Sequence, residues 1–140
     1  MIRTRPLPDG VAVTVDTLGR ALEQHPVVRF AYLFGRAAAG RLTPLSDIDV
    51  AVFLDDEVDP LEARLAAIGA VTAHLHSDEV DVVVLNSAPT SLVGRVLLTR
   101  KVILDRDPPL RHRFESLALR QFFDFRFLEH THLALRFGHG

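Results

Sequence analysis

The chain has 140 residues, a length that suits one domain, and its formal net charge is −2. It contains no cysteine, which excludes structural disulfides, thiolate zinc sites and a cysteine nucleophile. Hydrophobic residues make up 48% and charged residues 24% of the sequence, which is the balance of a globular protein rather than a disordered or fibrous one.

The charge is distributed unevenly along the chain. Residues 44–81 carry ten acids and one arginine, whereas residues 1–43 and 95–136 have balances of +3 and +4. An acidic centre between basic flanks suits cations held beside an anionic ligand, although exposed charge of either sign is usually just solvated. The small net charge gives no reason to expect binding to nucleic acid or a membrane surface. The N-terminus lacks the apolar core of a signal peptide, so we expect a cytoplasmic protein.

Helix and strand patterns alternate through the first half of the chain. Asp16 is expected to cap a helix that ends near His25. The apolar segment 27–34 predicts a buried strand, and Gly35 opens a tight turn that runs into a short helix. Residues 47–54 predict a second strand, with alternate side chains on opposite faces.

The same alternation continues through the second half and predicts an α/β domain. Asp59 is expected to cap a helix with four apolar residues on its buried face. A third strand is expected over residues 80–85 and a fourth over residues 101–104, with a short helix capped by Thr90 between them. A final helix is expected over residues 109–135. The four apolar residues of the helix after Asp59 are Leu61, Leu65, Ile68 and Val71.

Acidic residues stand inside otherwise apolar strands. Asp47 and Asp49 are two positions apart, so they share one face of their strand at a spacing of about 6.5–7 Å. Asp81 is the only charged residue of the third strand. If the two strands are neighbours, three carboxylates converge, and a divalent cation such as Mg²⁺ would compensate their repulsion. The alternative is that Asp47 caps its strand while Asp81 pairs with an arginine.

A glycine turn precedes the paired acids. The first strand ends at Gly35, and Asp47 follows twelve residues later. Glycine lets the backbone approach a neighbour closely, and a turn that leads into a helix presents N–H groups to phosphate. The layout therefore predicts a phosphate-binding turn beside a metal-binding carboxylate cluster.

These residues form a known pattern. Gly35-Arg36, ten intervening residues, Asp47-Ile48-Asp49 and then Asp81 on a later strand resemble the minimal nucleotidyltransferases of the DNA polymerase β-like nucleotidyltransferase superfamily. The resemblance implies the α/β (α+β) nucleotidyltransferase fold, with a mixed β-sheet of about four strands, helices packed on it and a long C-terminal helix. It also implies that residues 1–140 form a single minimal nucleotidyltransferase domain.

The resemblance implies a Mg²⁺-dependent enzyme that transfers AMP from ATP. Asp47 and Asp49 would hold Mg²⁺ on the nucleotide's phosphates. Asp81 would complete a second metal site, so that two Mg²⁺ ions are expected in all. It would also help to deprotonate the acceptor hydroxyl. The residues that would bind the nucleotide phosphates are Gly35, Arg36 and Ser46.

The resemblance also implies a protein partner. Many minimal nucleotidyltransferases are antitoxins of a helical HEPN-domain ribonuclease toxin encoded beside them, and some place AMP on a tyrosine of that toxin. We therefore expect a HEPN-type toxin as partner and acceptor, in a homo- or hetero-oligomer, with neither a membrane nor nucleic acid as a direct partner.

The sequence departs from the family pattern at Arg36, where the family has serine. The guanidinium could make a bidentate contact with phosphate, or it could fold onto Asp47 or Asp49 and occupy the space of the metal. Two alternatives therefore stay open beside the transferase. One is an antitoxin that neutralises its partner by binding alone, and the other is a small-molecule adenylyltransferase that needs a second chain.

The last helix carries more phenylalanines than one buried face needs. Core packing accounts for most of them, and an exposed remainder would form a surface for a partner or for self-association. The residues concerned are Phe114, Phe122, Phe123, Phe125 and Phe127.

Overall fold

The computed structural model describes residues 11–38, 48–75 and 80–137. Helices and strands alternate along these segments, as the sequence predicts. In chain order they are α1 (Val11–Glu23), β1 (Val28–Phe34), α2 (Gly35–Ala38), β2 (Ile48–Leu54), α3 (Pro60–Leu75), β3 (Val80–Val84), α4 (Thr90–Thr99), β4 (Lys101–Asp105) and α5 (Pro108–Phe137).

The four strands form one mixed sheet in the order β3-β2-β1-β4. β1 lies between β2 and β4 and is antiparallel to both, whereas β2 and β3 run parallel. The mixed sheet of about four strands, the helices packed on it and the long C-terminal helix are therefore confirmed. β3 is an edge strand, which becomes important for the site.

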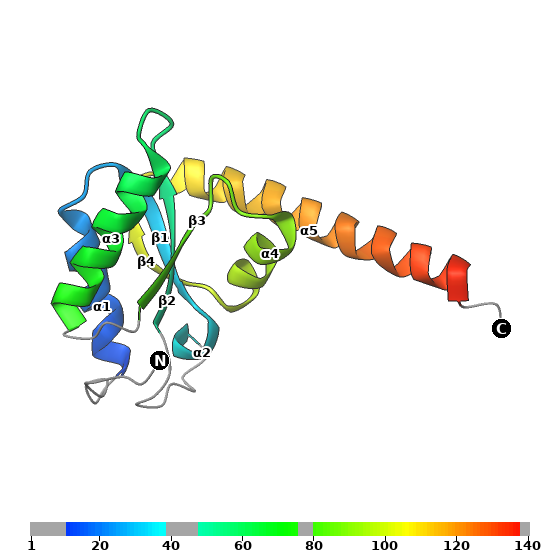
Figure 1. The fold of residues 1–140 in the computed structure, drawn as a ribbon, viewed down its shortest axis with the longest axis horizontal. Coiled ribbons are helices and arrows are strands. Elements are labelled where there is room, and N and C mark those ends of the chain that lie inside the picture. The colour runs from blue at the N-terminus through cyan, green and yellow to red at the C-terminus, as the bar shows by residue number, and fades with distance from the viewer. Residues whose placement is uncertain (1–10, 39–47, 76–79, 138–140) are drawn as a thin grey trace.

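Helices cover both faces of the sheet. α1 and α3 lie on one face, and α4 and the first half of α5 lie on the other (Figure 1). The predicted alternation of β2 is confirmed, because its even-numbered residues pack toward α1 and α3 while Ala51 and Phe53 pack toward α4 and α5. The even-numbered residues are Ile48, Val50, Val52 and Leu54.

Aromatic packing joins α5 to the sheet. The rings of Phe30 and Phe53 stack with their centroids 4.7 Å apart, and Phe114 packs against both. Further along α5, Phe122 lies so close to Gly94 of α4 that a β carbon on that glycine would overlap the ring. These contacts pack the first half of α5 against the hydrophobic core that lies between the sheet and α4.

The second half of α5 extends away from the body of the protein (Figure 1). Three of the five phenylalanines that the sequence singles out in this helix are exposed on it, so the prediction that core packing accounts for most of them is wrong, and the exposed remainder is the larger part. None of the described helices combines the length and the apolar character that crossing a membrane requires. Among residues 123–132, the large exposed apolar side chains are Phe123, Phe125, Phe127 and Leu128.

The predicted helix caps are partly confirmed. Asp59 caps α3, because its Oδ1 accepts a hydrogen bond of 3.0 Å from the N–H of Leu61. The prediction for Asp16 is wrong, because α1 begins at Val11 and Asp16 lies inside it. The prediction for Thr90 is also wrong: it is the first residue of α4, Pro89 occupies the cap position, and no side chain caps this helix.

The predicted buried face of α3 is half correct. Val71 is buried and Ile68 packs against the core, but Leu61 and Leu65 are 62% and 58% exposed. Ala67 packs against the core instead. The physical reason is that α3 places the small side chains of Ala63 and Ala67 toward the hydrophobic core that it shares with α1 and the sheet. The two leucines of its first half therefore face outward.

Candidate active site

Asp49 and Asp81 are register partners on the adjacent parallel strands β2 and β3. Neighbouring strands lie about 4.8 Å apart, and paired residues of parallel strands project to the same face of the sheet. The two strands that carry the acids are therefore neighbours, as the convergence of the carboxylates required. Carboxylate oxygens are the ligands that Mg²⁺ prefers, so this register pair is a candidate part of a cation site.

Gly35 lies beside the first of these acids. It directly follows β1, whose last residue, Phe34, pairs with Asp49 across the sheet. Its φ of 70° falls in the left-handed region that favours glycine. A β carbon at position 35 would stand 2.8 Å from Asp49 Oδ2, so the backbone of the turn approaches the carboxylate as only glycine allows.

The turn is tied to the end of α4 by Thr99. The N–H of Gly35 donates a hydrogen bond of 3.0 Å to Thr99 Oγ1. The threonine hydroxyl in turn donates to the carbonyl oxygen of Arg95, at 3.4 Å. Sequence reasoning missed Thr99, because a hydrogen bond across 64 positions leaves no local pattern.

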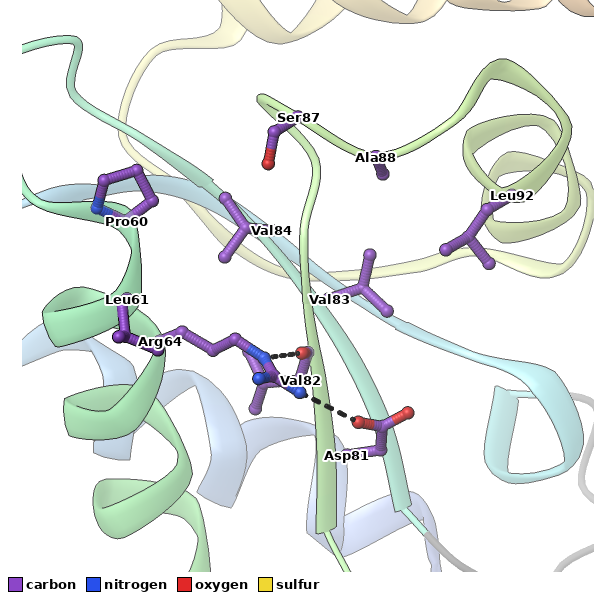
Figure 2. A pocket seen from close by; sticks show the side chains of 10 residues that line it. All are labelled: Pro60, Leu61, Arg64, Asp81, Val82, Val83, Val84, Ser87, Ala88 and Leu92. Carbon is purple, nitrogen blue, oxygen red and sulfur yellow. Dashed lines mark hydrogen bonds and ion pairs between the residues drawn. The ribbon is translucent and has the colours of Figure 1, made fainter.

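Asp81 forms an ion pair with Arg64 of α3 (Figure 2). Arg64 Nη2 lies 3.6 Å from Asp81 Oδ1, while its Nε donates a hydrogen bond of 2.7 Å to the carbonyl oxygen of Val82. The side chains of Arg64 and Asp81 are 42% and 59% exposed. An exposed ion pair contributes about 0–1 kcal/mol, so it holds the Asp81 carboxylate only weakly. The pairing of Asp81 with an arginine, expected as the alternative to a metal, is thus present in this structure.

The remaining predicted site residues are only partly described. Ser46 and Asp47 lie outside the described residues, and Arg36 is the second residue of α2. Among residues 11–38, 48–75 and 80–137, no group of three or more histidine or acidic side chains is placed to hold a metal ion. The described part of the site therefore consists of Gly35, Asp49 and Asp81.

A largely buried charged network joins β1 to α5 and was not predicted. Tyr32, which is fully buried in β1, donates a hydrogen bond of 2.8 Å to Glu115 Oε2 of α5. The same carboxylate oxygen lies 3.0 Å from Arg100 Nε and 3.0 Å from Arg111 Nη1. Arg111 also pairs with Asp105, at 2.7 Å. These contacts fix α5 to both β1 and the residue that follows Thr99.

The network changes the proton affinity of the tyrosine. Burial raises the pKa of Tyr32 far above its ordinary value of 10.0, and the hydrogen bond to Glu115 raises it further. The phenol therefore stays protonated and acts as a hydrogen-bond donor, not as an acid in catalysis.

Comparisons with known proteins identify the family and the fold. Residues 16–109 match the family described as Polymerase beta, Nucleotidyltransferase, which is more than half of the chain. No curated protein matches the chain.

Several solved structures have a similar fold. A crystal structure of a toxin–antitoxin with AMP-PNP matches with a TM-score of 0.63 and 25% identity, over 87% of this chain and 90% of the other. A structure of the toxin–antitoxin MntA-HepT matches with a TM-score of 0.58 and 25% identity, over 89% and 91%. A structure of a tri-AMPylated Shewanella oneidensis HEPN toxin in complex with MNT antitoxin matches with a TM-score of 0.60 and 23% identity, over 91% and 92%.

The family match spans the glycine turn, both described aspartates and the four-stranded sheet that brings them together. The structural matches cover most of both chains and show that the fold is shared. The chain therefore belongs to the polymerase β nucleotidyltransferase family.

Proposed function

We propose that this protein transfers AMP from ATP to a hydroxyl group of a HEPN-type toxin encoded nearby, and that it acts in this way as the antitoxin. The observation that carries the proposal is the register pairing of Asp49 with Asp81 beside the glycine turn, in a member of a nucleotidyltransferase family. The likeness to a toxin–antitoxin with AMP-PNP, at 25% identity, supports both the nucleotide and the partner. The proposed setting is the cytoplasm, with residues 1–140 as a single domain.

The donor groups fit Mg²⁺. Asp49 and Asp81 supply carboxylate oxygens on one face of adjacent strands, and the lack of a side chain at Gly35 lets the backbone of the turn approach Asp49 Oδ2. Asp47 stands two positions before Asp49 in the sequence, and we propose it as the third ligand, for two ions in all. Bound Mg²⁺ would neutralise charge on the phosphates and stabilise the charge that develops during transfer.

The chain's own residues would position the reactants. The acceptor hydroxyl oxygen attacks the α-phosphorus of ATP, the bond from that phosphorus to the bridging oxygen breaks, and pyrophosphate leaves with the electron pair. The hydroxyl proton passes to the Asp81 carboxylate, which is exposed enough to meet an incoming acceptor. Gly35, Arg36 and Ser46 are proposed to bind the phosphates, with Gly35 chiefly allowing close approach, because its own N–H is bonded to Thr99.

The intact mass of the partner tests the proposal. The purified toxin would be incubated with this protein and MgATP, and we expect its mass to increase in whole AMP units. Asp49→Asn should abolish the increase, whereas the matched variant Glu23→Gln, at an exposed position of α1, should preserve it. An unchanged mass with the wild-type protein would contradict the transfer of AMP.

A second candidate is an antitoxin that works by binding alone. The ion pair between Arg64 and Asp81 favours it, because an arginine here satisfies a carboxylate that the transferase needs for metal. The arginine at position 36 agrees with this candidate. It predicts that the toxin is still inhibited when Asp47, Asp49 and Asp81 are all replaced by asparagine.

A further inference from the structure

A groove of about 360 Å³ runs along the open edge of β3 and ends at Asp81 (Figure 2). Its floor is the strand itself, over residues 81–84. α3 forms one wall through Pro60, Leu61 and Arg64. The other wall is the segment that leads into α4, with Ser87, Ala88 and Leu92. The groove therefore joins helices from both faces of the sheet around an edge strand.

The backbone of β3 faces this groove. The N–H of Leu85 donates to the carbonyl oxygen of Val52 in β2, at 2.9 Å, so the odd-numbered residues here direct their backbone groups toward β2. By the alternation of a strand, Val82 and Val84 direct theirs to the open edge, where the Val84 carbonyl accepts a hydrogen bond of 3.4 Å from the N–H of Ser87. The hydrogen bond from Arg64 Nε to the Val82 carbonyl agrees with this direction. An edge of this kind is a template for an added strand.

The walls and the charge indicate what kind of segment would fit. Leu61, 62% exposed, and Leu92, half-buried, offer apolar contacts to alternate side chains of an added strand. Exposed acids flank Pro60 in the sequence without lining the groove, and Arg64 is the only lysine or arginine between positions 44 and 81. Charge complementarity therefore favours a segment with basic as well as apolar residues. The exposed acids are Asp55, Asp56, Glu57, Asp59 and Glu62.

Arg64 connects the groove to the carboxylate. It occupies the carbonyl of Val82 and, through the same guanidinium, holds Asp81. A strand added along β3 would supply its own N–H to the Val82 carbonyl and displace the arginine from it. The exposed ion pair between Arg64 and Asp81 is weak, so it would be lost once Arg64 no longer bonds to the Val82 carbonyl. The Asp81 carboxylate would then be released when the acceptor binds.

From these observations we propose that the β3 groove binds the acceptor segment of the protein partner as an extended, basic and apolar strand, with its hydroxyl delivered to Asp81. The inference rests on the proposed function and adds to it where the partner's segment binds. It also assigns Arg64 as a positioning residue that this segment displaces from Asp81.

The chain offers a matched pair of variants for the test. Leu61 and Leu65 are both exposed on α3, but only Leu61 lines the groove. Leu61→Arg places a cation where the basic segment would lie, so we expect the Kd of the complex with the toxin to rise at least tenfold. Leu65→Arg should change that Kd less than twofold. Equal effects of the two variants would overturn the proposal.

Amide hydrogen exchange gives an independent readout on the wild-type complex. The amides of Val82 and Val84 should exchange at least tenfold more slowly when the toxin is bound. A complex in which both amides exchange as in the free protein would overturn the proposal, as would the absence of a complex. Protected amides in a complex that transfers no AMP would contradict the proposed transfer of AMP but not the proposed binding of the segment. The affinity for MgATP reports on the nucleotide site separately, and Leu61→Arg should leave that affinity unchanged.

Discussion

Gly35 and Asp49 approach each other so closely that a β carbon on the glycine would stand 2.8 Å from the carboxylate oxygen Oδ2. The turn after β1 and the acid of β2 are thus built as one unit. This relationship gives a structural reason for glycine at the head of the motif, because the position combines a φ of 70° with a close approach to the Asp49 carboxylate.

The first prediction concerns this glycine. Gly35→Ala should lower stability by about 1–3 kcal/mol through backbone strain and should displace Asp49, so MgATP binding should be lost. The control is Gly69→Ala, in the middle of α3, where an added β carbon meets nothing within 4 Å. That variant should gain about 0.5–1 kcal/mol and bind MgATP normally. Calorimetric titration measures MgATP binding by both variants, and thermal unfolding measures their stability. Normal MgATP binding by Gly35→Ala would show that the glycine turn does not position Asp49.

Thr99 provides the second prediction. Thr99→Val keeps the shape of the side chain but removes the oxygen that accepts the Gly35 N–H, so the KM for ATP should rise about two- to tenfold, in line with a hydrogen bond of about 0.5–1.5 kcal/mol. Thr99→Ser retains the hydroxyl and should restore the wild-type KM. If valine and serine give the same KM, the hydrogen bond does not position the turn.

Much of the fold follows from local patterns in the sequence. The alternation of β2 predicts which of its residues face each core, because the side chains of a strand alternate with a period of two. Asp59 and Pro60 predict the start of α3 for a similar local reason. The buried face of α3 is less predictable, because alanines as well as leucines can face the core, and only the packing partner decides between them.

The site is predictable only where it depends on a motif. Asp49 and Asp81 stand out because aspartate is unusual in an otherwise apolar strand, and Gly35 stands out because it directly follows such a strand. Thr99, Arg64 and Glu115 carry no such signal, since each acts through a partner on a distant element. Asp47 and Ser46, outside the described residues, stay predictions.

The third prediction concerns pH. Tyr32 is the only tyrosine in the chain, so the absorbance of tyrosinate reports this residue alone. Because its folded-state pKa is raised above the ordinary value of 10.0, the stabilisation is fully present below pH 10 and is lost as the pH rises further. Tyrosinate should therefore form only together with unfolding, as followed by circular dichroism. Ionisation near pH 10 in protein that is still folded would contradict the buried hydrogen bond to Glu115.

The fourth prediction concerns the buried carboxylate. Glu115→Ala should lower the free energy of unfolding by about 3 kcal/mol, because it leaves Arg100, Arg111 and the Tyr32 hydroxyl without their shared acceptor. Glu129→Ala, at an exposed position of the same helix, should change it by less than about 0.5 kcal/mol. Urea unfolding of the two variants measures the difference, and a similar small effect of both would show that the network contributes little.

The central claim is that Asp49 and Asp81 form a metal-dependent nucleotide site. Calorimetric titration of the purified protein with ATP, with and without Mg²⁺, tests it most directly, on wild type, Asp49→Asn, Asp81→Asn and the control Asp56→Asn. We predict binding to wild type and to Asp56→Asn that requires Mg²⁺, and a loss of at least tenfold in affinity in the other two variants. ATP affinity that is independent of Mg²⁺, or equal in all four proteins, would contradict the claim.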